Sequence, residues 1–67
     1  MTTEEPKITD TARLNSSQIA EVLSISQSSV NRYFRQARLK SVSKLSNIAT
    51  GAEVKRFWRT FERYYNV

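Results

Sequence analysis

The stretch SISQSSVNRYFRQAR, residues 24–38, holds a polar break followed by an amphipathic basic run. Ser24 to Ser26 interrupt an apolar pattern, and the hydroxyl of Ser26 suits the cap of a new helix. The spacing that follows predicts a helix from about Gln27 to Arg38. Its apolar side is expected to carry Val30, Tyr33, Phe34 and Ala37, and its polar side Ser28, Asn31, Arg32 and Arg35.

A shorter helix is predicted just before this stretch, in SSQIAEVL at residues 16–23. Asn15 or Ser16 can cap it, because their side-chain oxygens accept the free amide hydrogens of a first turn. Ala20 is small enough to let two helices cross closely, and Ile25 can plug the turn between them. Two helices joined by such a tight turn predict a helix-turn-helix, in which the outer face of the second helix meets the major groove of DNA.

The remainder of the chain predicts a small hairpin and a third helix. KSVSKLSNIAT, residues 40–50, alternates only loosely, and a hairpin is favoured there over an irregular turn. Thr50 and Glu53 have the spacing of a capping box at the start of the third helix. The strongest periodicity of the chain then follows, in Val54, Phe57, Trp58, Phe61, Tyr64 and Tyr65.

Composition excludes several classes of function. The 67 residues allow one domain, and neither cysteine nor histidine is present. Disulfides, thiolate metal sites and the commonest general base are therefore excluded, and we expect no enzyme, no catalytic residue, no metal and no cofactor. No apolar run approaches the ~18 residues of a transmembrane helix, and the N-terminus is too polar for a signal peptide. These features predict a cytoplasmic, nucleoid-associated protein with no membrane partner.

The charge is high and unevenly distributed. The net charge is +5, yet Glu4, Glu5 and Asp10 crowd the first ten residues. After Leu23 only two acids remain, against nine lysines and arginines. A basic body favours a polyanionic partner, with a merely solubilising surface charge as the alternative. Residues 1–10 are expected to form a flexible tail that buries nothing, although Ile8 could touch the core. Residues 11–67 are expected to form the domain.

Residues 14–58 resemble the MerR-like and excisionase-like DNA-binding domains. LNSSQIAEVLSISQSSVNRYFRQARL matches their helix-turn-helix, ARLKSV their basic step and first wing strand, and SNIATGAEVKRFW their second wing strand and next helix. The resemblance implies a mainly α fold, a small winged helix-turn-helix with three helices and a short two-stranded wing. Two departures stand out, since Ser24 takes the place of a usual glycine, and Gln36 and Ala37 occupy the region of another.

The expected function is sequence-specific binding of double-stranded DNA, as a transcriptional regulator or, as the resemblance implies, a recombination directionality factor. Alternatives are a DNA anchor for segregation or phage packaging, and a helical domain that binds an acidic protein. The expected DNA-contacting residues are Ser26, Gln27, Ser28, Asn31, Arg32, Arg35, Arg38, Lys40 and Lys44.

The aromatic residues of the third helix are interpreted as core rather than as a platform for stacking bases, because they follow helical spacing. Their number exceeds what a small domain is expected to bury. The far end of this helix is therefore a candidate surface for self-association, through Phe61, Tyr64 and Tyr65.

Overall fold

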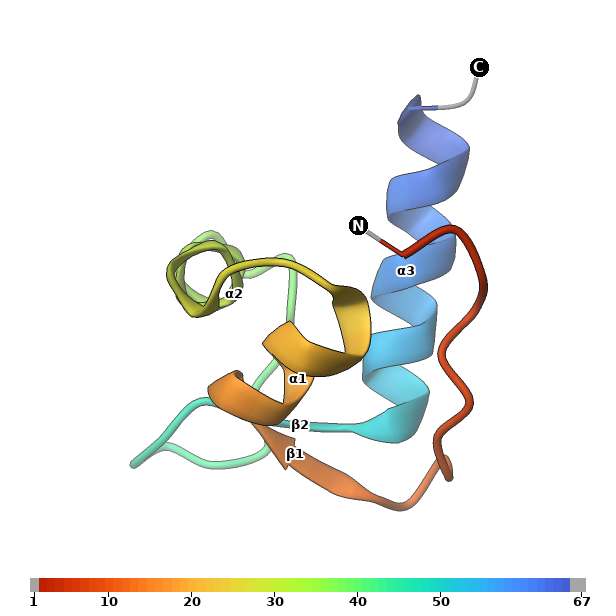
Figure 1. The fold of residues 1–67 in the computed structure, drawn as a ribbon. Coiled ribbons are helices and arrows are strands. Elements are labelled where there is room, and N and C mark those ends of the chain that lie inside the picture. The colour runs from red at the N-terminus through yellow and green to blue at the C-terminus, as the bar shows by residue number, and fades with distance from the viewer. Residues whose placement is uncertain (1, 66–67) are drawn as a thin grey trace.

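Three helices and a two-stranded antiparallel sheet make up the fold (Figure 1). The computed structural model describes residues 2–65, with side chains described as far as Phe61. In chain order the elements are β1 (Arg13–Asn15), α1 (Ser16–Leu23), α2 (Gln27–Arg35), β2 (Ile48–Thr50) and α3 (Gly51–Tyr65). Among the described residues, no helix has both the length and the apolar character needed to cross a membrane.

The ends of α1 and the start of α2 follow the predicted capping chemistry. Asn15 caps α1 through its side-chain oxygen, which accepts from the amide of Gln18 at 2.9 Å, while the Gln18 side chain accepts from the amide of Asn15. Ser26 caps α2, because its hydroxyl accepts from the amide of Ser29 at 3.2 Å. Between the helices Ser24 has φ 58°, the left-handed conformation that normally favours glycine. The expected helix pair and its three-residue turn are therefore confirmed.

The second helix ends earlier than predicted, at Arg35 instead of Arg38. Ala37 adopts φ 60° and leaves the helical path. The amides of Ala37 and Arg38 turn back to the carbonyls of Phe34 and Tyr33, the two hydrogen bonds of a Schellman motif. Ala37 is consequently exposed, and its expected place on the apolar face of the helix was wrong.

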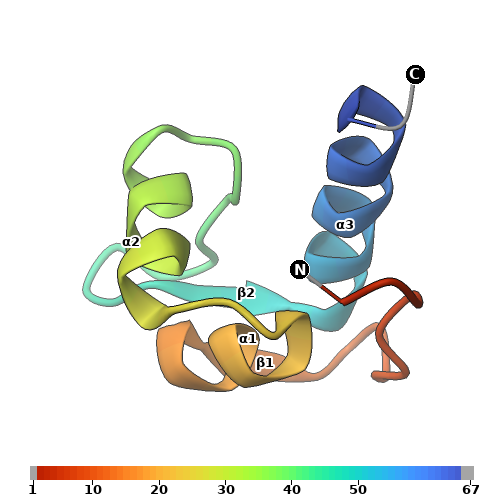
Figure 2. The ribbon, with the colours of Figure 1, turned by 45° about the horizontal axis from the view of Figure 1, so that its top comes forward.

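The predicted hairpin within residues 40–50 is also wrong. Residues 40–47 contain no strand, and β2 pairs instead with β1, in the register Arg13 with Thr50, Leu14 with Ala49 and Asn15 with Ile48. The sheet thus joins the residues that precede α1 to those that precede α3. It lies below the two short helices in Figure 1, and Figure 2 shows β2 leading directly into α3. Loop 40–47 is closed at its base by a hydrogen bond from the amide of Val42 to the carbonyl of Ile48, 2.8 Å.

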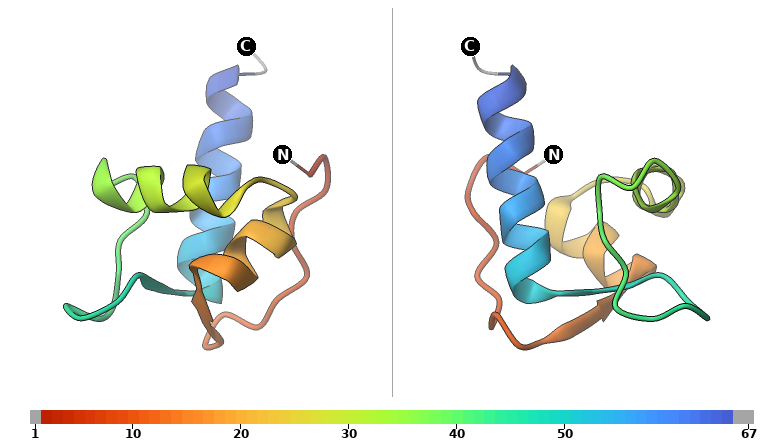
Figure 3. Two further views of the ribbon diagram at one scale, coloured as in Figure 1. Left: turned by 60° about the vertical axis from the view of Figure 1, so that its left-hand side comes forward. Right: turned by 180° about the vertical axis from the view of Figure 1, so that it is seen from behind.

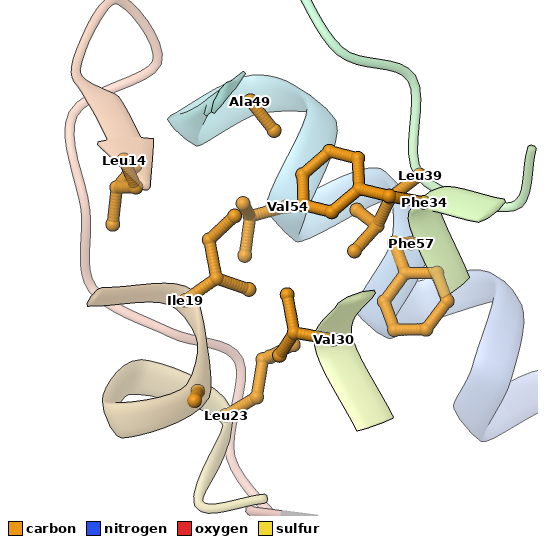
Figure 4. Packing of buried hydrophobic residues seen from close by; sticks show 10 residues of the cluster. Leu14, Ile19, Leu23, Val30, Phe34, Leu39, Ala49, Val54 and Phe57 are labelled. Atoms are coloured by element: carbon orange, nitrogen blue, oxygen red, sulfur yellow. The ribbon is translucent and has the colours of Figure 1, made fainter. Parts of the chain in front are cut away.

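One hydrophobic core connects all five elements (Figure 4). Ile19, Leu23 and Val30 are fully buried where α1 meets α2, and Ala20 is buried beside them. An aromatic cluster holds α2 against α3, with the rings of Tyr33 and Phe57 4.9 Å apart between centroids. The buried core residues are Leu14, Ile19, Ala20, Leu23, Val30, Phe34, Leu39, Ala49, Val54 and Phe57.

The first half of α3 is buried as expected, but only half of its predicted capping box forms. The Thr50 hydroxyl accepts from the amide of Glu53 at 3.2 Å. The Glu53 carboxylate does not return to Thr50. It accepts instead from the Arg56 side chain and from the amide of Lys40. Glu53 therefore links α3 to the segment that leaves α2.

Residues 2–10, here called the N-terminal strap, lie along α3 on the side away from α2 (Figures 1 and 3). The strap is anchored at Thr2, whose amide donates to the carbonyl of Leu23 at 2.8 Å and whose carbonyl accepts from Trp58 Nε1 at 3.0 Å. Pro6 is buried, so the expectation that this segment has almost nothing to bury was wrong. The signal that was missed is chemical complementarity, since the acids of the strap match the cations of α3.

Candidate nucleic-acid interface

The outer face of α2 carries exposed polar and cationic side chains. Val30 and Phe34 hold the other face of the helix in the core, and the 100° step per residue then turns the predicted contact residues outward. Neither Arg32 nor Arg35 forms an ion pair within the described part of the chain. Exposed on this face, beside the cap residue Ser26, are Gln27, Ser28, Arg32 and Arg35.

Asn31 differs from its neighbours, because its side chain is already engaged. Its Oδ1 accepts from the hydroxyl of Ser16 at 2.7 Å and from Nδ2 of Asn47 at 3.4 Å. Ser16 is itself buried at the start of α1. A bidentate contact with adenine needs both the oxygen and the nitrogen of an asparagine amide. The predicted base contact would therefore cost these internal bonds, and the geometry favours a positioning role for Asn31, tying α2 to α1 and to the loop.

Arg38 and Lys40 follow α2 and are partly used by the fold. The Arg38 guanidinium lies over the ring of Tyr33, 5.6 Å from its centroid, and over that of Phe61 at 5.9 Å. The backbone carbonyl of Arg38 accepts from Arg56 Nη2 at 3.0 Å. Lys40 uses only its backbone amide, so its side chain is exposed with its charge available. Arg38 is thus held against two rings, whereas the Lys40 side chain is exposed to solvent.

Lys44 stands in loop 40–47, which is organised around one hydroxyl. The Ser41 Oγ lies within hydrogen-bonding distance of the carbonyls of Ser43 and Ser46, at 2.7 and 2.8 Å, and accepts from the amide of Ile48. Lys44 is exposed beside Leu45, a residue that is 97% exposed. Figure 3 shows the loop projecting from the same side of the molecule as α2. Residues 40–47, where the wing was expected, therefore form a loop that is held together by hydrogen bonds to the Ser41 hydroxyl.

The described ion pairs all lie on α3, which leaves the cations around α2 unbalanced. Lys55 pairs with Asp10, Arg56 with Glu53 at 2.6 Å, and Arg59 with Glu5 at 2.7 Å. Residues 24–52 contain no aspartate or glutamate. They contain five cations, Arg32, Arg35, Arg38, Lys40 and Lys44. The fold consequently concentrates positive charge on α2 and the loop that follows it.

These pairs shift the pKa values of the carboxyl groups downward. The Arg59 guanidinium lowers the pKa of Glu5, and the Lys55 ammonium lowers that of Asp10. Hydrogen bonds from Arg56, and after it from the amide of Lys40, lower the pKa of Glu53. All three acids are therefore ionised at neutral pH, and each offsets the cation beside it.

Phe61, the first residue of the predicted self-association surface, packs within the molecule. Its ring lies 5.9 Å from that of Phe57 and 6.2 Å from that of Tyr33, between centroids. The side chains of Tyr64 and Tyr65 lie outside the described residues. The described residues also contain no cluster of three or more acids that could hold a metal ion. Comparison with known proteins found no matching family model, curated protein or solved structure.

Proposed function

We propose that the chain binds double-stranded DNA, with α1 and α2 as a helix-turn-helix and α2 as the recognition helix. The observation that carries the proposal is the outward, unpaired cationic face of α2 within a segment that has no acids. Solvated cations on one helix face would satisfy the surface-charge alternative. That alternative gives no reason for all three ion pairs to neutralise cations of α3 while the cations of α2 stay unpaired.

The side chains of α2 suit the major groove. An α-helix with its side chains is about 10–12 Å across, and the major groove is about 12 Å wide, so the groove admits a helix such as α2. Arg32 and Arg35 can donate to the O6 and N7 acceptors of guanine. Gln27 can pair with adenine, whose N6 donates and whose N7 accepts. Lys40 and Lys44 would contact phosphates, which fix the position of a protein on the duplex without reading sequence. Transcriptional regulation and control of site-specific recombination are the two roles we propose for such binding.

The first prediction tests base readout by Arg32. A binding sequence is selected from random duplexes, and affinity for it and for random DNA is then measured by fluorescence anisotropy. Arg32→Ala should cost about 1–3 kcal/mol on the selected site and relax the base preference at one position. It should change affinity for random DNA much less.

Lys7→Ala provides the matched control, since it removes one exposed cation from the strap, on the side away from α2. It should reduce affinity for both DNAs slightly and equally. If Lys7→Ala and Arg32→Ala have the same effect, binding depends only on net charge and α2 is not the recognition helix. Equal losses on selected and random DNA from Arg32→Ala alone would assign Arg32 to phosphate contact.

A further inference from the structure

The N-terminal strap neutralises two cations of α3, burying most of the Lys55 side chain and leaving that of Arg59 63% exposed. Lys55 and Arg59 are one helical turn apart and lie on one face of α3, where each meets a carboxylate of the strap. The two Arg59 bonds to Glu5 are 2.7 and 3.1 Å long, a bidentate pair. The Lys55 side chain is only 19% exposed, although lysine rarely gives up solvent without a partner. The strap therefore occupies this surface as a ligand would.

Backbone contacts fix the strap in register with these cations. The amide of Ala52 donates to the carbonyl of Asp10 at 3.1 Å, which holds Asp10 beside Lys55. Gly51 lies against the carbonyl of Thr9 so closely that a side chain there would overlap it. At the other end Trp58 Nε1 holds the carbonyl of Thr2. Hydrogen bonds at both ends of the strap therefore place Glu5 and Asp10 beside their partners.

We propose that the strap is an internal competitor that keeps nucleic acid off α3, so that Glu5 and Asp10 confine binding to the face of α2. The strap that pairs with Lys55 and Arg59 runs along α3 on the side away from α2 (Figure 3). Uncovered, these two cations would offer a second, sequence-independent site for phosphates. Phosphate contacts contribute to every sequence alike, so a second such site would lower the preference for the correct one. This inference rests on the proposed function and assigns the strap a part in its specificity.

The chain supplies the variants for a direct test. Glu5→Gln with Asp10→Asn removes both charges of the strap that face α3. Glu4→Gln with Glu21→Gln is the matched control, because it changes the net charge equally at two exposed acids that have no ion pair within the described residues. Affinity for a random-sequence duplex is measured against salt concentration, and circular dichroism verifies that each variant is folded.

The salt dependence counts the phosphates neutralised, at a slope of about 0.9 per contact. The Glu5→Gln/Asp10→Asn variant should bind random DNA more tightly than the control variant, with a slope steeper by about one to two units. Adding Arg59→Ala to it should remove about one unit of that gain. In the otherwise unchanged protein, Arg59→Ala should leave the slope as it is, because Glu5 already holds Arg59.

Two results of the slope measurement would overturn the proposal. One is that the strap variant and the Glu4→Gln/Glu21→Gln control share the same slope. The other is that Arg59→Ala alone lowers the slope as Arg35→Ala does, which would mean that Arg59 contacts DNA with the strap in place. Failure of the proposed function looks different, since Arg32→Ala and Arg35→Ala would then have no effect while the strap variant could still gain binding. Absence of binding in the strap variant would refute the competitor role.

Discussion

Ser24 and Ala37 occupy the left-handed backbone positions that end α1 and α2. Each amide bonds back into its helix, and the next amide, that of Ile25 or Arg38, reaches the carbonyl five residues earlier. The resemblance expected from the sequence drew attention to Ser24, and to the region of Gln36 and Ala37, as departures from a glycine. It did not reveal that α2 ends at Arg35 and that Ala37 turns away from the helix, since arginine and alanine are both good helix formers. Tertiary packing of Leu39 and the stacking of Arg38 on Tyr33 favour the earlier end.

The strain at Ala37 can be tested at that residue. A residue with a Cβ loses about 1–2 kcal/mol in the left-handed region, and glycine avoids most of this at some entropic cost. Ala37→Gly should therefore raise the free energy of unfolding by about 0.5–1 kcal/mol, measured by thermal or urea denaturation. Ala52→Gly, at an exposed helical position of α3, should lower it by about 1 kcal/mol. Equal destabilisation by both substitutions would contradict the left-handed conformation of Ala37.

At the level of elements, local signals were readable from the sequence and long-range ones were not. Caps at Asn15 and Ser26 depend on residues three apart, and the apolar periodicities of the helices depend on residues three or four apart. The strand Arg13–Asn15 is three residues long and pairs with residues 48–50, so no local pattern announces it. The hairpin prediction was wrong for the same reason. Ile48 and Ala49 pair with the distant strand β1, and this pairing accompanies the burial of Leu14.

Gly51 joins β2 to α3 and leaves room for the strap, which makes it a test of how these elements meet. Alanine is ordinarily the better helix former by about 1 kcal/mol. At Gly51 the new methyl group would overlap the Thr9 carbonyl, and overpacking of this kind costs about 1–3 kcal/mol. We expect Gly51→Ala to lower the melting temperature and to change Trp58 fluorescence as the strap shifts.

Ala52→Ser is the control for that substitution, since it adds a similar volume one residue later at an exposed position. It should leave the fluorescence of Trp58 unchanged. A Gly51→Ala variant as stable as the parent, with the same fluorescence, would show that residues 9 and 10 do not lie against α3.

Across the whole molecule, the sequence disclosed the sign of the charge but not its placement. The acidic beginning and basic body were visible, and so was the polar face of α2. The pairs Lys55–Asp10 and Arg59–Glu5 were not, because they depend on where the strap crosses α3. The Glu53–Arg56 pair is local, three residues apart on α3, but the bond from the Lys40 amide to Glu53 depends on the early end of α2. For the candidate site, periodicity therefore predicted which residues of α2 point outward. It could not show that Asn31 is bonded internally or that Arg38 is stacked.

Acid titration tests this placement in the whole molecule. Glu5, Asp10 and Glu53 have pKa values below those of free side chains, 4.5 for glutamate and 3.8 for aspartate. The unfolded chain therefore binds more protons than the folded one in this range. The stability that these groups contribute is complete above pH 4.5 or so and is lost as the pH falls through their lowered folded-state values.

Melting curves between about pH 6 and pH 2 should show this loss, and substitution should flatten it. Glu53→Gln should have the largest effect, because the Glu53 side chain is only 16% exposed and accepts from both Arg56 and Lys40. Glu5→Gln and Asp10→Asn should have smaller effects, since solvent screens exposed pairs. The fluorescence of Trp58 should change over the same pH range in the parent protein. Protonation of Glu5 and Asp10 releases the strap, whose Thr2 carbonyl accepts from the Trp58 indole. A pH-independent fluorescence signal down to global unfolding would mean that the strap is held by its apolar and backbone contacts alone.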